Sequence, residues 1–567
     1  MNTRRTWAGL IWAGTVAGCA VGPNYRAPES PAPAAWSALT SGTAATQPSR
    51  PTTRPADVAT WWQALRDPLL DALVAQAVES NLDLRLATAR VREARAQRDV
   101  ATAAFWPQVN IGSSYDYSGS SENVAPAPKS AGQTLGGLLP NVSVTPGAVN
   151  GPGGIKLPAA VVNPQRIGPV RLGGSRSPSV TVQPGALTIP GGVGHPTATL
   201  SPPGATTAAG LARQRNLFQA GFDATWELDI FGGVRRSSEA GEADLAASEE
   251  SRRAALVTLV SEVALDYVQL RGSQRRLAIA HENIAAQQDT VALTQARYKA
   301  GFTNELDVAQ AQAQLATTRS QVPLLETSIR QAIYQLSVLL GEPPDALVAE
   351  LEQEAPLPVT PLEVPVGLPS DLLRRRPDIR ATERQLAAAT ARIGVATADL
   401  FPKFSLTGSF GTQTADMRHF LDSKSLFWSI GPAVSWPIWD AGRIRANIEV
   451  QNARQEEALV TYEQTVLTAF QDVESALVSY TNEKVRHQSL ADAVKWNQQA
   501  NDLSNELYSR GLAAFLNVLV SQQALYASQD QLVQSETTAI TNLISLYKAL
   551  GGGWDAPDDP PTDNGGY

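Results

Sequence analysis

The segment YKAGFTNELDV at residues 298–308 returns as YSRGLAAFLNV at residues 508–518. Both copies place a tyrosine three residues before a glycine and a leucine five residues after it. Glycine adopts a positive φ without strain, so this pattern is typical of a tight turn between two helices. The offset of 210 residues (508 − 298) also pairs Trp226 with Trp436. We therefore predict that the chain is a duplication of one structural unit.

A second offset locates an insertion in the first unit. Trp106-Pro107 corresponds to Phe401-Pro402 at an offset of 295 (401 − 106), which leaves 85 extra residues (295 − 210) in the first unit. Gly, Pro, Ser, Thr and Val dominate residues 119–215, so we predict a long loop there. The predicted organisation is a first repeat at 61–341, a Pro-rich linker at 342–368, a second repeat at 369–551 and a disordered tail at 552–567.

Long helices with a seven-residue period are predicted in both repeats. One unbroken series of apolar residues spaced seven apart is Leu256, Val263, Leu270, Leu277, Ile284, Val291 and Tyr298. A sustained period of seven is the signature of coiled-coil packing. The pattern indicates either a bundle with long arms or a helical cylinder, and Pro323 should bend or interrupt its helix. The predicted helices span about residues 67–104, 238–298, 303–341, 443–508 and 513–551.

Four strands are predicted from alternation of apolar and polar side chains. Phe218, Phe222 and Trp226 share one face of such a run, opposite Gln219 and Asp223. These runs approach the ~10 residues of a membrane-spanning strand, although a soluble sandwich gives the same alternation. Four strands cannot close a barrel, and open edges in lipid are prohibitively costly, so spanning strands would require more than one copy of the chain; three copies would give twelve strands. The predicted strands span about residues 107–117, 217–229, 402–411 and 427–438.

The amino-terminal segment reads as an export signal. Arg4 and Arg5 precede an apolar run from Trp7 to Ala17, and Gly18-Cys19 follows. The run is shorter than the ~20 residues of a membrane-spanning helix. Because the last residues resemble a bacterial lipobox, we expect a leader at 1–18, lipid on Cys19 and an extended strap at 19–60; a plain signal peptide is the alternative.

Composition argues against several classes of function. The net charge of −8 argues against a nucleic-acid binder, which needs a basic surface. The basic insertion at 119–215 is a solvated spacer or a contact for anionic surface lipid. The four histidines are scattered, and neither metal-ligand spacing nor a phosphate-binding loop is present. We expect no enzyme, no cofactor and no metal site.

Several motifs together resemble one family. They are Cys19-Ala20-Val21-Gly22-Pro23-Asn24-Tyr25, Asp67-Pro68-Leu69, Leu373-Arg374-Arg375-Arg376-Pro377-Asp378-Ile379-Arg380, Phe401-Pro402 and Tyr526-Ala527-Ser528-Gln529-Asp530. In this order they resemble outer-membrane efflux lipoproteins of the TolC superfamily, in the NodT/OprM-like branch. The resemblance covers nearly all of the chain after residue 18, apart from the insertion.

The resemblance implies a fold and partners. The fold would be α+β: a coiled-coil helical tunnel joined to a homotrimeric, twelve-stranded antiparallel barrel in the outer membrane of a Gram-negative bacterium, in contact with its lipid. A periplasmic adaptor (membrane fusion) protein and an inner-membrane, RND-type, proton-driven pump would complete a tripartite system that exports drugs, toxic compounds or metals. The alternatives are an exit duct for type I protein secretion and a periplasmic coiled-coil lipoprotein that spans no membrane.

The resemblance also assigns roles to the helix turns. The tips that dock the adaptor would include Lys299, Gly301, Phe302, Arg510, Gly511 and Leu512. The periplasmic gate or constriction would include Tyr298, Asp307, Tyr508, Asn517 and Val520. Asp307 would form a ring of three carboxylates, which attracts cations; capping of its own helix is the alternative. Because Asn517 is the second-repeat match of Asp307 and Val520 stands where many relatives have aspartate, we predict weaker cation selectivity.

Overall fold

The computed structural model describes residues 20–28, 33, 35–37, 50–52, 58–119, 214–361 and 363–554. The leader, Cys19, most of the insertion and the tail after residue 554 lie outside the described residues. Contacts divide the chain into two compact units. The smaller unit comprises Ser114–Gln219 and Thr414–Phe420, and within it Tyr115 donates a hydrogen bond to Asn216 at 3.0 Å. All other described residues belong to the larger unit.

Three helices of the first repeat recur residue for residue in the second. The first repeat contains α2 (Pro68–Ser80), α3 (Leu82–Ala103), α4 (Gly233–Lys299), α5 (Glu305–Leu339) and α6 (Val348–Leu351). The second contains α7 (Pro369–Arg375), α8 (Pro377–Ala398), α9 (Arg443–Ser509) and α10 (Phe515–Ala549). The matching pairs are α3 with α8, α4 with α9 and α5 with α10; α4 and α9 each have 67 residues, and α5 and α10 each have 35. No helix among the described residues is both long and apolar enough to cross a membrane.

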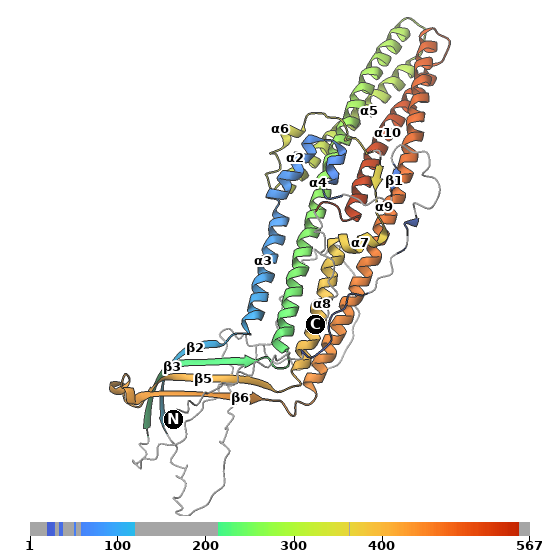
Figure 1. The fold of residues 1–567 in the computed structure, drawn as a ribbon. Helices are drawn as coiled ribbons and strands as arrows, with labels where there is room; N and C mark the ends of the chain where they lie inside the picture. The colour runs from blue at the N-terminus through green and yellow to red at the C-terminus, as the bar shows by residue number, and fades with distance from the viewer. Residues whose placement is uncertain are drawn as a thin grey trace, which may run out of the picture. The chain divides into compact units, whose positions relative to one another are not determined.

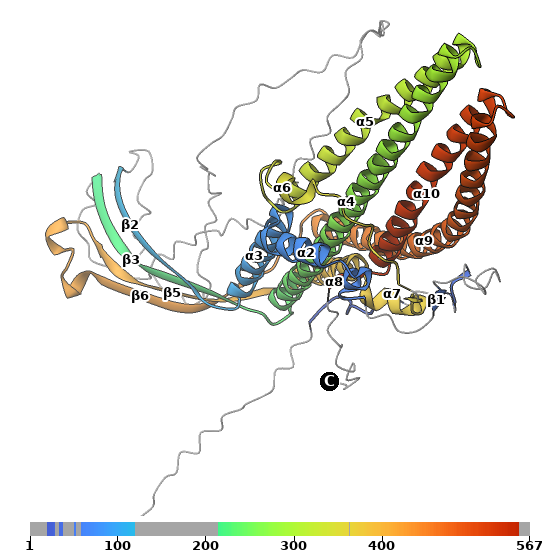
Figure 2. The same ribbon diagram turned by 90° about the horizontal axis from the view of Figure 1, so that it is seen from above.

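Two long hairpins dominate the larger unit. Figure 1 shows α4 with α5 and α9 with α10 as antiparallel pairs, and Figure 2 shows the same pairs from a second direction. The middle of the predicted heptad seams is buried, since Val263, Leu270 and Val473 are 0 % exposed, whereas Tyr298 at the end of its series is 44 % exposed. Helix α5 continues through Pro323, so the helix is not interrupted there, and a bend at Pro323 stays a prediction. The single helix predicted at 67–104 is in fact two, because Asn81 ends α2 and caps α3 by accepting from Leu84 N.

The four predicted strands form one sheet. It contains β2 (Gln108–Gly119), β3 (Gln214–Leu228), β5 (Lys403–Thr414) and β6 (Leu426–Ser435), in the order β2-β3-β5-β6. Strands β5 and β6 are antiparallel and pair Phe404 with Val434. Strands β2 and β6 are therefore the edges of the sheet. A second, parallel pair joins β1 (Arg50–Thr52) to β4 (Glu363–Pro365).

Hydrogen bonds at the ends of the elements recur in both repeats. Trp226 Nε1 donates to Phe105 O at 2.9 Å, and Trp436 Nε1 donates to Leu400 O at 3.0 Å. The two tryptophans are 210 residues apart in the sequence and the two carbonyls are 295 residues apart, which are the offsets of their respective segments. The duplication therefore extends from the sequence to individual side-chain contacts.

The main core lies where the short helices pack on the hairpins. The amino-terminal segment contributes Trp36, which is 0 % exposed and donates Nε1 to Gly367 O at 3.0 Å. Trp61 stacks on Tyr547 with ring centroids 5.2 Å apart. The remaining described elements are three short 3-10 helices, which are η2 (Trp61–Leu65), η3 (Met417–His419) and η4 (Ser423–Ser425).

Candidate functional site

The turns at the ends of both hairpins have the same geometry. Gly301 has φ 76°, and Gly301 N donates to Tyr298 O at 2.9 Å while Phe302 N donates to Arg297 O at 2.8 Å. Gly511 has φ 77° and makes the same pair of bonds one repeat later. This pattern is the Schellman motif, which satisfies the last helical carbonyls and needs a residue without a Cβ at the positive φ. The predicted turn glycines are thus explained by the backbone.

The predicted docking residues are exposed at these turns. Phe302 is 74 % exposed and Leu512 is 72 % exposed. Lys299 and Arg510 are also exposed, and Arg510 pairs with Glu506 at 2.5 Å. Each turn therefore presents one large apolar side chain beside one cation. Exposed apolar side chains at a rigid turn are suited to contact with another protein.

Tyr508 lies inside a small core near the turns. It is 3 % exposed and packs with Ala311, Phe515 and Val518, apart from the main core. The Arg297 guanidinium lies 4.6 Å from the Tyr508 ring centroid, and Arg297 Nη1 donates to Ser509 O at 3.2 Å. A cation over an aromatic face is attracted by the ring quadrupole. Arg297, on α4, therefore joins the first hairpin to the second at its end.

Sequence reasoning missed Arg297. Its counterpart at the 210-residue offset is Leu507, so the repeat comparison that identified Tyr298 and Tyr508 contained a signal. The signal is the change from an apolar residue to a cation directly before the tyrosine. The two tyrosines also differ, because Tyr298 is 44 % exposed. Only Tyr508 belongs to a contact between hairpins of the same chain.

Among the predicted constriction residues, Asp307 is held by local hydrogen bonds and the two residues on α10 are exposed. Thr303 Oγ1 donates to the Asp307 carboxylate. Asn304 caps the helix, because Asp307 N donates to Asn304 Oδ1 at 3.1 Å. Asp307 is half-buried at the first turn of α5, where a carboxylate is favoured by the helix dipole. Val520 is 55 % exposed and Asn517 is exposed. Capping thus accounts for the position of Asp307, and its contribution to a ring stays a prediction.

A polar cavity separates the Tyr508 cluster from the main core. It measures about 520 Å³ and lies between α4, α9 and α10. Its lining includes Asn283, Gln287, Thr290, Asn505 and Gln522. Gln287 is 3 % exposed, and neither amide atom has a hydrogen-bond partner. Since buried amides need partners, we expect ordered water here. Gln522 Nε2 donates to Thr290 Oγ1 at 2.8 Å, which joins α10 to α4 beside the cavity.

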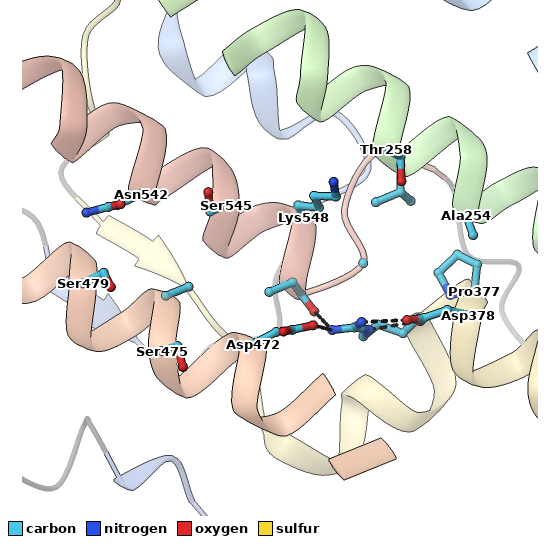
Figure 3. A pocket seen from close by; sticks show the side chains of 15 residues that line it. Ala254, Thr258, Pro377, Asp378, Asp472, Ser475, Ser479, Asn542, Ser545 and Lys548 are labelled. Atoms are coloured by element: carbon cyan, nitrogen blue, oxygen red, sulfur yellow. Dashed lines mark hydrogen bonds and ion pairs between the residues drawn. The ribbon is translucent and has the colours of Figure 1, made fainter. Parts of the chain in front are cut away.

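A second cavity of about 550 Å³ surrounds Arg376, in the motif that carries the family resemblance (Figure 3). Arg376 binds Asp378 at 2.6 Å, Asp472 at 3.1 Å and Ala549 O at 3.2 Å. Burial disfavours the charged guanidinium, but both carboxylates raise the pKa of Arg376 overall. Asn81 donates to Leu339 O in the corresponding place of the first repeat. The arginine therefore holds the end of α10, which is a structural role.

Comparison with known proteins gives a consistent result. The family described as outer membrane efflux protein matches residues 73–144, 203–342 and 368–552. The chain is 31 % identical to the pyoverdine export outer membrane protein OpmQ of Pseudomonas aeruginosa, over 88 % of each chain. It is 27 % identical to nodulation protein T of Rhizobium leguminosarum bv. trifolii, over 94 % of each chain. The structure of the outer-membrane channel OprN superposes with a TM-score of 0.74 at 30 % identity, covering 94 % of this chain and 100 % of that one.

Proposed function

The chain belongs to the outer membrane efflux protein family, and from this premise we propose that three copies assemble into one continuous duct with a gate at the hairpin turns. The chain is an outer-membrane efflux channel with a TolC-like fold, as its relatives and the OprN likeness show. The proposal concerns its assembly, its gate, its anchor and its partners. The observation that carries it is a set of helix faces that lack a partner within the chain.

The duplication predicts where the missing partners lie. Within the chain, α4 packs against both α8 and α10 of the second repeat. The counterparts of these contacts would join α9 to an α3 and an α5, and no such packing of α9 is observed among the described residues. A second copy supplies α3 and α5, and its edge strand β2 supplies the counterpart for β6. A contact that joins two different surfaces can close into a ring.

Exposure supports this assignment. On α4, Ala240, Val257 and Val268 are 5 %, 6 % and 0 % exposed. Their counterparts on α9, which are Val450, Leu467 and Val478, are 46 %, 69 % and 47 % exposed. The same holds on the opposite side, where Tyr334 of α5 is 40 % exposed and its counterpart Ile544 is 0 % exposed. Burial of these side chains between copies would contribute roughly 25 cal/mol per Å².

The number of three copies rests on the likeness to the family's channels. One chain with four strands lies below the practical minimum of about eight strands for a closed barrel, and three chains supply twelve. Ile111, Trp428 and Val434 are 76 %, 75 % and 61 % exposed. A soluble sandwich would bury such a face, whereas a membrane barrel turns it to lipid.

A cysteine pair tests the assembly. A Cβ built on Gly272 of α4 would lie 3.2 Å from Thr537 Cβ of α10. The counterparts are Asn482 on α9 and Thr327 on α5, and both are exposed. Disulfides need Cβ atoms ~3.5–4.5 Å apart. Oxidation of the double variant Thr327→Cys/Asn482→Cys should give covalent dimers and trimers on denaturing gels, with nothing larger.

Two controls accompany this test. Each single variant should give no covalent dimers or trimers, and this result would also show that the native Cys19 does not form the cross-links. The variant Gly272→Cys/Thr537→Cys should close within one chain and stay monomeric on the gel. A double variant that remains monomeric while this internal pair closes would refute the proposed ring.

The gate and partners follow from the turns. We assign the Arg297–Tyr508 contact to the closed state, because it joins α4 to α9 at the ends of the two hairpins. The exposed Phe302 and Leu512 would dock a periplasmic adaptor, which links the duct to an inner-membrane pump. Relatives named for pyoverdine and antibiotics support small molecules as the exported class.

The anchor proposal rests on the segment after residue 19. Val21 N donates to Phe231 O at 3.1 Å, and Arg236 donates to Asn24 Oδ1 at 2.6 Å. Tyr25 Oη donates to Glu383, and burial together with that carboxylate raises the pKa of Tyr25. This segment is thereby fixed beside the start of α4. Lipid on Cys19 would then insert next to the barrel, which palmitate labelling of wild type against Cys19→Ser would test.

A further inference from the structure

The cavity around Arg376 has balanced charge. The Arg376 guanidinium lies between Asp378 and Asp472 and contacts both, as Figure 3 shows, and Lys548 is a second base in the lining. Four elements contribute to the lining: α4, α8 with the residue before it, α9 and α10. Each acidic side chain therefore has a basic partner within the same chain.

The duplication defines a corresponding cavity between copies. Its lining would come from α3, α4 and α5 of one copy and from α9 of the next, if the proposed ring is correct. Asp378 and Asp472 correspond to Asp83 and Glu262, so both acids are retained. Ala476 corresponds to Asp266, which adds a third acid.

The basic partners are not retained. Arg376 corresponds to Asn81, and Lys548 corresponds to Val338. The contact between copies would therefore enclose three carboxylates at a place where the contact within the chain has two acids and two bases.

Other charged groups near this cavity do not restore the balance. Helix α3 carries the base Arg85, which is the counterpart of Arg380. Within the chain, Arg380 pairs with Glu250, and Arg253 pairs with the same carboxylate. On α9 of the next copy the counterpart of Glu250 is Val460 and that of Arg253 is Glu463, so Glu463 would be the acid available to Arg85. From α2, Glu79 replaces Arg374, and from α5 the lining residues Gln335 and Val338 carry no charge.

We propose that Asp83, Glu262 and Asp266 form an acid-sensitive joint between copies, which takes up protons as the ring assembles and holds more tightly at acidic than at neutral pH. This inference rests on the proposed ring. Like charges enclosed without counter-ions oppose assembly unless some of them are protonated.

The direction of the pH dependence follows from linkage. Burial, together with the nearby charge of Glu262, already raises the pKa of Asp266 to about 6 in the single chain. Assembly removes more water, so the pKa of Asp266 is higher in the ring than in the free chain. A group with the higher pKa in the assembled state favours assembly below its free-chain pKa and loses that contribution as pH rises through its assembled-state pKa. Each proton taken up changes the association constant by up to about tenfold per pH unit in that window.

Dissociation of the detergent-purified assembly at pH 5.5 and pH 8.0 tests the proposal. Assembled and free chains are separated by size exclusion after heating or dilution. The wild type should dissociate at least tenfold more at pH 8.0. The variant Glu262→Gln/Asp266→Asn should lose most of this difference by becoming tighter at pH 8.0. Val338→Lys restores the base found in the second repeat, and it should also strengthen assembly at pH 8.0.

A matched control removes charge elsewhere. Asp345→Asn alters an exposed carboxylate in the turn after α5 and should keep the wild-type pH dependence. If wild type and Glu262→Gln/Asp266→Asn dissociated equally at both pH values, the proposal of an acid-sensitive joint would be refuted. Cross-linking through Thr327→Cys/Asn482→Cys tests the ring separately. If the ring forms but its dissociation does not depend on pH, only the acid-sensitive joint is refuted; if no cross-links form, the ring itself is refuted.

Discussion

Removal of the Arg297 side chain should weaken the contact between the α4–α5 and α9–α10 hairpins at their ends. Its guanidinium lies 4.6 Å from the Tyr508 ring centroid and donates to Ser509 O at 3.2 Å. A partly exposed cation–π contact contributes about 0.5–1 kcal/mol, and one hydrogen bond from a charged donor adds about 1 kcal/mol after solvent screening. Arg297→Ala should therefore shift the balance from closed to open by about 1–2 kcal/mol per chain, or roughly 5- to 30-fold.

Single-channel recording in planar bilayers measures this shift. Resting open probability should rise in Arg297→Ala and in Tyr508→Ala, and cells that carry either variant should become more sensitive to vancomycin. Tyr508→Phe is the matched control, because the buried Tyr508 hydroxyl has no hydrogen-bond partner and its loss should leave the closed state intact. If Arg297→Ala kept wild-type resting conductance while Tyr508→Ala opened the channel, the cation would be irrelevant to the gate.

Three further outcomes are expected. Asn517→Asp/Val520→Asp should increase cation selectivity, visible as a shifted reversal potential in a salt gradient, and unchanged selectivity would contradict a constriction at these positions. Trp36→Ala removes a fully buried side chain and its bond to Gly367 O, so it should cost about 3–5 kcal/mol in the free energy of unfolding, measured by helical circular dichroism in denaturant. Arg376→Gln leaves two half-exposed carboxylates without their base and should cost about 2–3 kcal/mol, below the 3–5 kcal/mol of a fully buried pair; a stability equal to wild type would contradict its role at the end of α10.

The long elements could be predicted because their signals are periodic. Heptads place Leu270 and Val473 in seams whose middle the structure buries completely, and alternation marks all four strands of the sheet. The turn glycines were predictable as well, since their positive φ excludes most other residues. Each of these signals is local, so it needs no knowledge of what packs against the element.

Contacts between distant segments were not predictable in the same way. Arg297 meets Tyr508 across 211 positions (508 − 297), and no local pattern distinguishes it from any other arginine near a helix end. Asn81 was expected inside one helix, yet its side chain accepts from Leu84 N and donates to Leu339 O, which favours a cap over a helix interior. Trp36 lies in a Pro-rich segment whose composition suggested only an extended strap, and its burial depends on a groove that the second repeat forms.

The two repeats have diverged most where their surroundings differ. Tyr508 is enclosed within the chain by Ala311, Phe515 and Val518, whereas the residues that correspond to Ala311 and Phe515 around Tyr298 are Ser521 and Glu305. The same contrast separates the balanced cavity of Arg376 from its acidic counterpart. In both cases the contact within a chain is apolar or neutralised, and the contact assigned between copies is polar or charged. A duct that must open at one end needs contacts that yield and contacts that hold, and the divergence of a duplicated chain supplies both kinds. Arg376 marks a contact that holds within the chain, whereas the Arg297–Tyr508 contact is released on opening. Tyr298 and Asp266 mark the places at which copies would separate first.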